Sequence, residues 1–275
     1  MTKNNFQKTA IRQRMEATGE PYSVAAREIA ALPAITWPSL DNALAGGFKP
    51  GHFYVIAAQP KVGKNLVAVN LAIKLSRPNQ QIAFINLESS ETELIQSLIR
   101  VDAGVSAVPL SENELTDSER KAVNRSLKHI SKNVLLPQAL NTIEKIREYL
   151  LSQPKLKAVV IDYFQLVETE ATGTLLEKRA YAAQAVKKLA LELDIAVILM
   201  AQLHRSPDAK ASTLMSVSGV SELSASADVV IHLSRVEYSD IIGFHVLKHR
   251  QGALSSFSLS WPQQESKKLM EIETI

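Results

Sequence analysis

A glycine and a lysine at positions 63 and 64 stand where an apolar, β-prone stretch gives way to a helical pattern. The apolar stretch begins at Phe53, and the short loop that follows it contains Pro60. In this order of strand, loop and helix, backbone N–H groups and the helix dipole converge on a phosphate. Lys64 would add a positive charge for the terminal phosphates of a nucleotide. The stretch therefore predicts a phosphate-binding loop; an ordinary strand–loop–helix turn with a surface lysine is the alternative.

The loop departs at two positions from the pattern G-x-x-x-x-G-K-[ST]. Ala58 stands in place of the first glycine, and Asn65 stands in place of the hydroxyl that binds Mg²⁺. The amide oxygen of Asn65 can ligate Mg²⁺, but Mg²⁺ tolerates little geometric error. Slow or absent turnover is therefore an expected consequence of Asn65.

Polar residues also follow three later apolar runs: Glu88, Asp162 and Gln202 each come directly after one. Strands that alternate with helices predict βαβ units and a mostly parallel sheet. Ligands of such sheets bind at the carboxyl ends of the strands. We therefore expect Lys64, Glu88, Asp162 and Gln202 to converge on one site.

Each of these residues has a chemical role and a simpler alternative. Asp162 would hold Mg²⁺ through water, or it caps a strand end. Glu88 would act as general base for the attacking water, or it is a solvated turn acid. Gln202 would hydrogen-bond the γ-phosphate, or it is an amide satisfied by backbone. Lys248 and Arg250 alternate along one predicted strand and so face the same side. They would reach a neighbouring subunit's phosphate site, or they form an exposed basic edge. The predicted catalytic residues are Glu88, Gln202, Lys248 and Arg250, the predicted nucleotide-binding residues are Ala58, Gln59, Pro60, Lys61, Val62, Gly63, Lys64, Asn65 and Asp162, and the predicted metal ligands are Asn65 and Asp162.

The elements that position these residues divide the chain into three parts. Residues 1–34 predict a short helical arm, residues 35–262 the α/β domain, and residues 263–275 a charged, surface-like tail. Residues 110–133 are expected to be helical and to bury the stripe Val123, Leu127 and Ile130. Strands are expected at 53–56, 82–87, 134–136, 158–162, 196–201, 229–233, 244–247 and 257–260.

The composition is that of an ordinary soluble globular chain, with 46% hydrophobic and 21% charged residues among 275. There is no cysteine, which excludes disulfides, thiol catalysis and cysteine-type zinc sites. No apolar run approaches the roughly 18 residues of a membrane span, and the N-terminus lacks the apolar core of a secretion signal. We therefore expect a cytoplasmic protein without a membrane partner. The net charge of +3 permits a polyanionic partner without requiring one.

From about Leu32 to Trp261 the chain resembles the C-terminal ATPase domain of the DnaB-type replicative DNA helicases, within the RecA-like group. The segments I-D-Y-x-Q-L and A-Q-L-x-R are together the most specific. The resemblance rests, in order, on L-D-N-A-L-A-G-G-F-K-P-G, A-A-Q-P-K-V-G-K-N, F-I-N-L-E-S-S, V-V-I-D-Y-F-Q-L-V, I-L-M-A-Q-L-H-R, S-A-D-V-V-I-H-L-S-R and K-H-R-Q-G.

This resemblance implies a RecA-like P-loop NTPase fold and an ATP-dependent DNA helicase or single-stranded DNA translocase, working as a hexameric ring. ATP and Mg²⁺ would bind between subunits at the predicted residues. Lys248 and Arg250 would be inserted from the neighbouring subunit. The segments 168–176 and 204–221 would face the central channel and bind single-stranded DNA.

The chain also departs from the family. Residues 1–34 replace the N-terminal collar domain of the replicative helicases, which predicts a phage, plasmid or other mobile-element relative whose arm is a candidate site for a replication partner. The segment 204–221 lacks the Arg-Glu pair expected of a DNA-gripping loop. Two alternatives stay open: a nucleotide-binding regulatory or helicase-loading protein with weak or no ATP hydrolysis, and a recombinase-like filament ATPase.

Overall fold

The fold is described from a computed structural model. It describes residues 36–76, 80–106, 115–203, 221–235, 239–262 and 267–272, with residues 12, 15, 16, 19, 21 and 22. Most of the predicted arm 1–34 lies outside these residues, as does the predicted DNA-binding segment 204–221 up to its last residue.

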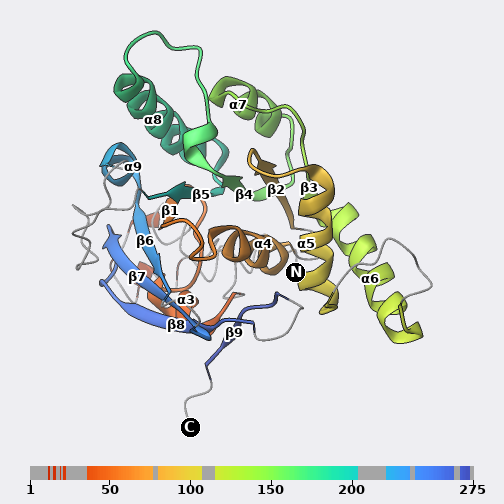
Figure 1. The fold of residues 1–275 in the computed structure, drawn as a ribbon. Coiled ribbons are helices and arrows are strands. Elements are labelled where there is room, and N and C mark those ends of the chain that lie inside the picture. Colours follow the sequence, from red (N-terminus) through yellow and green to blue (C-terminus); the bar gives the residue numbers. More distant parts are fainter. Residues whose placement is uncertain are drawn as a thin grey trace.

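A nine-stranded sheet runs through the centre of the molecule (Figure 1), in the order β3-β2-β4-β5-β1-β6-β7-β8-β9. The strands from β3 to β6 in this order are parallel, and β7, β8 and β9 continue the sheet in antiparallel fashion. The predicted mostly parallel sheet is therefore confirmed. The strands are β1 (Phe53–Ala58), β2 (Gln81–Asn86), β3 (Val134–Leu135), β4 (Leu156–Asp162), β5 (Ala196–Gln202), β6 (Val229–Ser234), β7 (Ile241–His249), β8 (Ser256–Ser260) and β9 (Met270–Glu271).

Helices cover both faces of the sheet. The helices α3, α4, α5 and α6 lie on one face, and α7, α8 and α9 lie on the other (Figure 1). A short 3₁₀ turn, η2, follows β4. The helical elements are α3 (Pro38–Ala43), α4 (Lys64–Leu75), α5 (Glu91–Ala103), α6 (Asp117–Asn133), α7 (Ile143–Leu151), η2 (Phe164–Leu166), α8 (Leu175–Leu193) and α9 (Ser221–Ser226).

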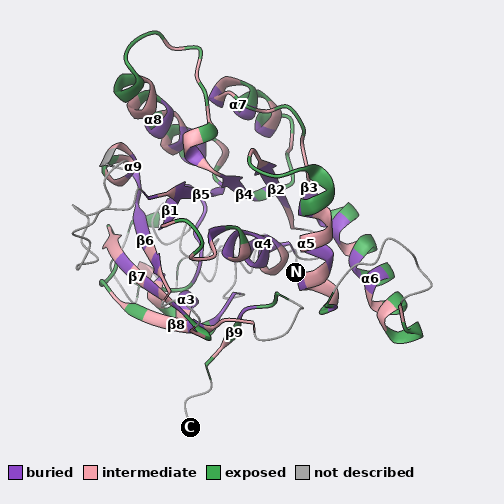
Figure 2. Ribbon diagram, in the orientation of Figure 1, coloured by how far each residue is buried: buried purple, intermediate pink, exposed green. Residues whose placement is uncertain are grey.

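Two hydrophobic cores result, one on each face. In β1, Tyr54 and Ile56 point into the core shared with α4, whereas Phe53 and Val55 point into the core shared with α8. Figure 2 shows the central strands buried along their length and the exposed residues on the outer sides of the helices. Parallel strands that are buried on both faces read as continuous apolar runs. This is why their positions could be predicted from the sequence.

The stripe predicted for α6 is only partly buried. Val123 and Ile130 are buried, but Leu127 is 42% exposed, so the prediction was wrong for this residue. The helix contacts mainly α5 and the β2–β3 edge of the sheet. Its buried side is therefore narrow, and it is completed by the polar residues Ser126 and Asn133.

The sequence predicted a surface-like tail after residue 262. The described part of this segment, residues 267–272, is instead partly buried. Leu269 is buried, and its carbonyl oxygen accepts a hydrogen bond from Trp37 Nε1 at 3.0 Å. The short strand β9 pairs with β8. The short apolar pair Leu269 and Met270, with charged residues on both sides, gave too weak a signal to predict this contact. In the described part of the chain, no helix has the length and apolar character needed to cross a bilayer.

Candidate nucleotide-binding site

The loop between β1 and α4 wraps around a pocket at the carboxyl end of the sheet. Lys61 and Gly63 have φ angles of 68° and 112°, in the left-handed region. Such turns aim successive backbone N–H groups into one concavity, next to the positive end of α4. The pocket has a volume of about 360 Å³ and is lined by Ala58, Gln59, Pro60, Lys61, Gly63, Lys64, Asn65, Leu66, Glu88 and Gln202. It thus brings together most of the predicted site residues.

Lys64 is the buried centre of this site, with 7% of its surface exposed. Its ammonium donates to Glu88 Oε2 at 3.0 Å and to Asp162 Oδ1, and it lies 4.1 Å from the centroid of the Tyr163 ring. A buried cation is tolerated when carboxylates surround it. The prediction that Lys64, Glu88 and Asp162 converge is therefore confirmed as geometry.

Asp162 lies beneath the pocket and is itself buried. Burial raises the pKa of its carboxyl, because desolvation penalises the charged form, and the adjacent Lys64 opposes this rise in pKa. The net direction is upward, so the Lys64 charge is what keeps an anion tolerable at this depth.

The Asn65 side chain turns its amide nitrogen toward Glu88. Its Nδ2 donates to Glu88 Oε2 at 3.1 Å, the same oxygen that Lys64 contacts. Glu88 is therefore held by two donors from the first turn of α4. The simpler interpretation of Glu88 as a solvated turn acid does not account for these contacts. Its side chain is nevertheless 36% exposed.

The side chains suit a phosphate and its usual cation. One buried ammonium and a helix N-terminus favour an anion, and the oxygens of Asp162, Glu88 and Asn65 are the hard ligands that Mg²⁺ prefers. Across the described residues, no group of three or more acidic, histidine or cysteine side chains could hold a metal alone. Mg²⁺ commonly takes several of its ligands from water and substrate phosphates.

Gln202 ends β5 and lines the same pocket. Its backbone is held by a residue that sequence reasoning had not singled out: Gln165 Nε2 donates to the Gln202 carbonyl oxygen at 2.7 Å, and the Gln202 N–H donates to Gln165 Oε1 at 3.1 Å. The only signal for Gln165 was its place within the segment I-D-Y-F-Q-L.

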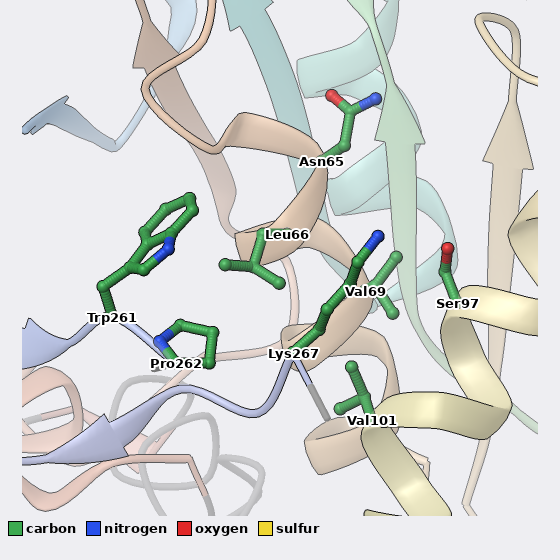
Figure 3. Close-up of a pocket in the computed structure, with 8 residues that line it drawn as sticks. All are labelled: Asn65, Leu66, Val69, Ser97, Val101, Trp261, Pro262 and Lys267. Atoms are coloured by element: carbon green, nitrogen blue, oxygen red, sulfur yellow. The ribbon is translucent and has the colours of Figure 1, made fainter. Parts of the chain in front are cut away.

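A second hollow of about 430 Å³ adjoins the first and shares Asn65 and Leu66 with it. Figure 3 shows α4 forming its floor, with α5 on one side and the segment after β8 on the other. Trp261 approaches the loop so closely that a Cβ at Gly63 would lie 2.4 Å from its ring. The lining residues are Asn65, Leu66, Val69, Ser97, Val101, Trp261, Pro262 and Lys267.

Lys248 and Arg250 lie away from this pocket. The prediction placed both on one strand, but β7 ends at His249 and Arg250 is in the following turn. Both side chains nevertheless reach the same place: Lys248 Nζ donates to the Ser224 carbonyl oxygen at 2.5 Å, and Arg250 Nη2 donates to that of Ala225 at 3.1 Å. They thus contact the carboxyl end of α9.

The predicted loop 168–176 is anchored at its start and exposed at its end. The Glu168 carbonyl oxygen accepts from the Ile143 N–H at 3.0 Å, and Thr169 Oγ1 donates to Glu144 Oε1 at 2.8 Å. The loop ends slightly earlier than predicted, because Thr174 caps α8. Leu175, at the start of α8, is 65% exposed.

Comparison with known proteins agrees with this fold. The DnaB-like helicase C terminal domain family matches residues 35–269. The replicative DNA helicase DnaB of Treponema pallidum is 29% identical over 230 residues, covering 81% of this chain and 52% of that protein. A probable plasmid replicative DNA helicase of Chlamydia trachomatis is 26% identical over 226 residues, covering 79% and 50%. The chain thus spans about half the length of these relatives. The solved structure of a DnaB-like replicative helicase superposes with a TM-score of 0.80 at 22% identity, covering 98% of this chain and 67% of that one.

Proposed function

Because the chain belongs to the DnaB-like helicase C-terminal domain family, we propose that it is the ATP-hydrolysing motor of a DNA helicase or single-stranded DNA translocase. The observation that supports this most strongly is the convergence of Lys64, Glu88 and Asp162 beside the loop that precedes α4. A lysine and two carboxylates at the carboxyl ends of parallel strands suit phosphoryl transfer to water. The match to plasmid-type relatives favours a mobile-element origin.

The residues of the site have separate roles in hydrolysis. Lys64 and the loop N–H groups hold the phosphates, and Glu88 accepts the proton of the attacking water. Gln202 hydrogen-bonds the γ-phosphate from the end of β5. Asp162, through water, and Asn65 would hold Mg²⁺, which would supply countercharge to the phosphates. Lys64 must leave its two carboxylates when it turns to a phosphate, so nucleotide binding removes one of the two donors that hold Glu88.

The nucleotide base fits the second hollow. This hollow continues from the loop pocket along α4, and its walls are largely apolar apart from Asn65, Ser97 and Lys267. The Trp261 ring lies beside Gly63, and the Arg235 guanidinium lies 3.5 Å from its centroid. A base would stack on the opposite face of the ring.

The position of Arg250 favours action on a neighbouring subunit. Its N–H donates to the carbonyl oxygen of Asp228, which directly precedes β6. The nucleotide loop instead follows the carboxyl end of β1, the parallel neighbour of β6. The two ends of strands of this length lie roughly 15–20 Å apart, so Arg250 and the nucleotide loop lie at opposite ends of these parallel strands. We therefore assign Lys248 and Arg250 to the site of an adjacent subunit in a homo-oligomeric, hexameric ring.

Single-stranded DNA is the proposed track. The segments 168–176 and 204–221 are assigned to it, and the second immediately precedes the rest of α9, whose end Lys248 and Arg250 contact. Residues 1–34 are assigned to a neighbouring subunit or a replication partner. We place the protein in the cytoplasm, where replication takes place.

Glu88→Gln tests the catalytic assignment. It keeps the size of the side chain and removes the base, so nucleotide binding should stay within about threefold while hydrolysis falls about 10²- to 10⁴-fold. Glu91→Gln, an exposed acid nearby at the start of α5, is the matched control and should hydrolyse ATP normally. Equal hydrolysis by Glu88→Gln and wild type would contradict the role of Glu88.

A second candidate function is a nucleotide-binding regulatory or helicase-loading protein with little hydrolysis. Asn65 favours it, because its amide nitrogen donates to Glu88, the residue that would otherwise act as the catalytic base. A large gain of hydrolysis in Asn65→Thr would support this second function.

A further inference from the structure

The sheet leaves the backbone of Gln202 without a strand partner on one side. β5 pairs with β4 only as far as Leu199, which is opposite Ile161. On its other side, β5 continues to pair with β1 through Gln202, and the next N–H, that of Leu203, donates to the Ala58 carbonyl oxygen at 2.8 Å. The N–H and carbonyl of Gln202 itself therefore point toward the space beyond the end of β4.

The Gln165 side chain fills that space. Its amide donates to the Gln202 carbonyl oxygen at 2.7 Å and accepts from the Gln202 N–H at 3.1 Å. A primary amide is the side chain that can do both at once, as a peptide group of a neighbouring strand would. These two hydrogen bonds also fix the orientation of the Gln165 amide. Its oxygen must accept from the Gln202 N–H, and its nitrogen must donate to the Gln202 carbonyl oxygen.

We propose that Gln165 is a positioning residue, which holds the end of β5 so that the Gln202 side chain reaches the γ-phosphate end of the pocket. This rests on the proposed ATPase function. Gln165 lies three residues after Asp162, and its neighbour Phe164 is buried. One short segment thus fixes both the deepest carboxylate of the site and the backbone of the residue that senses the phosphate.

The predicted consequence is a loss of discrimination between ATP and ADP. Without Gln165 the backbone of Gln202 loses two hydrogen bonds, and its side chain no longer has one defined position at the pocket. The phosphates common to both nucleotides still bind the loop and Lys64. A role that was merely structural would weaken ATP and ADP binding alike.

The test compares Gln165→Met, Gln202→Ala and the double variant, with Gln138→Met as the matched control. Gln138 is an exposed residue whose amide contacts only a neighbouring carbonyl oxygen in the described structure, that of Leu136. Binding of a non-hydrolysable ATP analogue and of ADP is measured by calorimetry. We expect Gln165→Met to reduce the preference for ATP over ADP by about three- to tenfold, the size of one hydrogen bond. ADP affinity should stay within about twofold, and the double variant should resemble Gln202→Ala alone.

A second measurement works without nucleotide. Amide hydrogen exchange by NMR should be about tenfold or more faster at Gln202 in Gln165→Met, with Val197 to Leu199 unchanged. If Gln165→Met fails to fold, Gln165→Glu replaces it, since a carboxylate cannot donate to the Gln202 carbonyl. Unchanged exchange at Gln202, or a retained ATP preference, would overturn the positioning role. If the wild-type protein binds neither nucleotide, the proposed function fails. Faster exchange at Gln202 in Gln165→Met would then still show that Gln165 holds the Gln202 backbone.

Discussion

Replacing Lys64 by methionine tests the physical basis of the site. Methionine keeps the length and apolar stem of the side chain but removes the charge. Asp162 would then stay in place with 4% of its side chain exposed and no cation beside it. The described residues offer no other cation in hydrogen-bonding distance of its carboxylate.

The magnitude follows from the two contacts of Lys64. Removing one partner of a buried ion pair costs about 3–5 kcal/mol. The contact with the partly exposed Glu88 contributes little, about 0–1 kcal/mol, because solvent screens it. We therefore expect the free energy of unfolding at neutral pH to fall by about 3–5 kcal/mol. For a chain of this size, this corresponds to a Tm lower by roughly 6–20 °C.

The loss should depend on pH in a defined direction. The pKa of Asp162 is already raised by burial, and removing Lys64 raises it further. A carboxyl whose pKa is higher in the folded state binds more protons there, so stability is lost as the pH rises. The deficit of Lys64→Met should be small below the ordinary aspartate pKa of about 3.9. It should grow until the pH passes the raised folded pKa.

Urea unfolding followed by far-UV circular dichroism, at about pH 4.5 and about pH 7.5, measures this deficit. Lys61→Met, at an exposed position of the same loop, is the matched control and should have wild-type stability. Adding Asp162→Asn to Lys64→Met should restore most of the stability but no nucleotide binding. A deficit that is equal at both pH values, or that Asp162→Asn does not relieve, would refute the reasoning.

Three further substitutions separate the parts of the site. Asn65→Thr should leave ATP hydrolysis similar or up to a few-fold higher if the chain is a working enzyme, and steady-state phosphate release checks this; a jump from none to robust turnover would move the assignment to the regulatory function. Arg250→Ala should leave ATP affinity within about twofold and abolish most hydrolysis by the oligomer, and unaffected hydrolysis would exclude the role in a neighbouring site. Gly63→Ala should weaken nucleotide binding and destabilise the fold by about 1–3 kcal/mol or more, because its φ is 112° and the new Cβ would meet Trp261. Gly46→Ala, with φ 110° and open space around it, measures the backbone strain alone.

The sheet and the convergence of the site could be predicted because both follow from local patterns. Apolar runs located the buried parallel strands, and the rule that ligands bind at their carboxyl ends placed Lys64, Glu88 and Asp162 together. The capping boxes Ser90–Glu93 and Thr116–Glu119 are likewise local, because each joins residues only three positions apart.

Other features depend on contacts between distant segments. Gln165 contacts Gln202 across 37 residues, and the contact exists only because the pairing of β4 with β5 stops short of Gln202. The burial of Leu269 against Trp37 depends on β9 joining the far edge of the sheet. The turn that holds Arg250 lies beyond the last residue of β7, and an alternating apolar pattern cannot fix a strand end to within one or two residues.

We propose that this chain is a DNA-dependent ATPase motor. The most direct test of this proposal is steady-state ATP hydrolysis by the full chain with Mg²⁺, with and without single-stranded DNA, at low salt so that phosphate contacts are not screened. The proposed function predicts hydrolysis that single-stranded DNA stimulates and that Glu88→Gln abolishes. Absence of hydrolysis in both conditions, with ATP still bound, would contradict the motor function and favour the regulatory one.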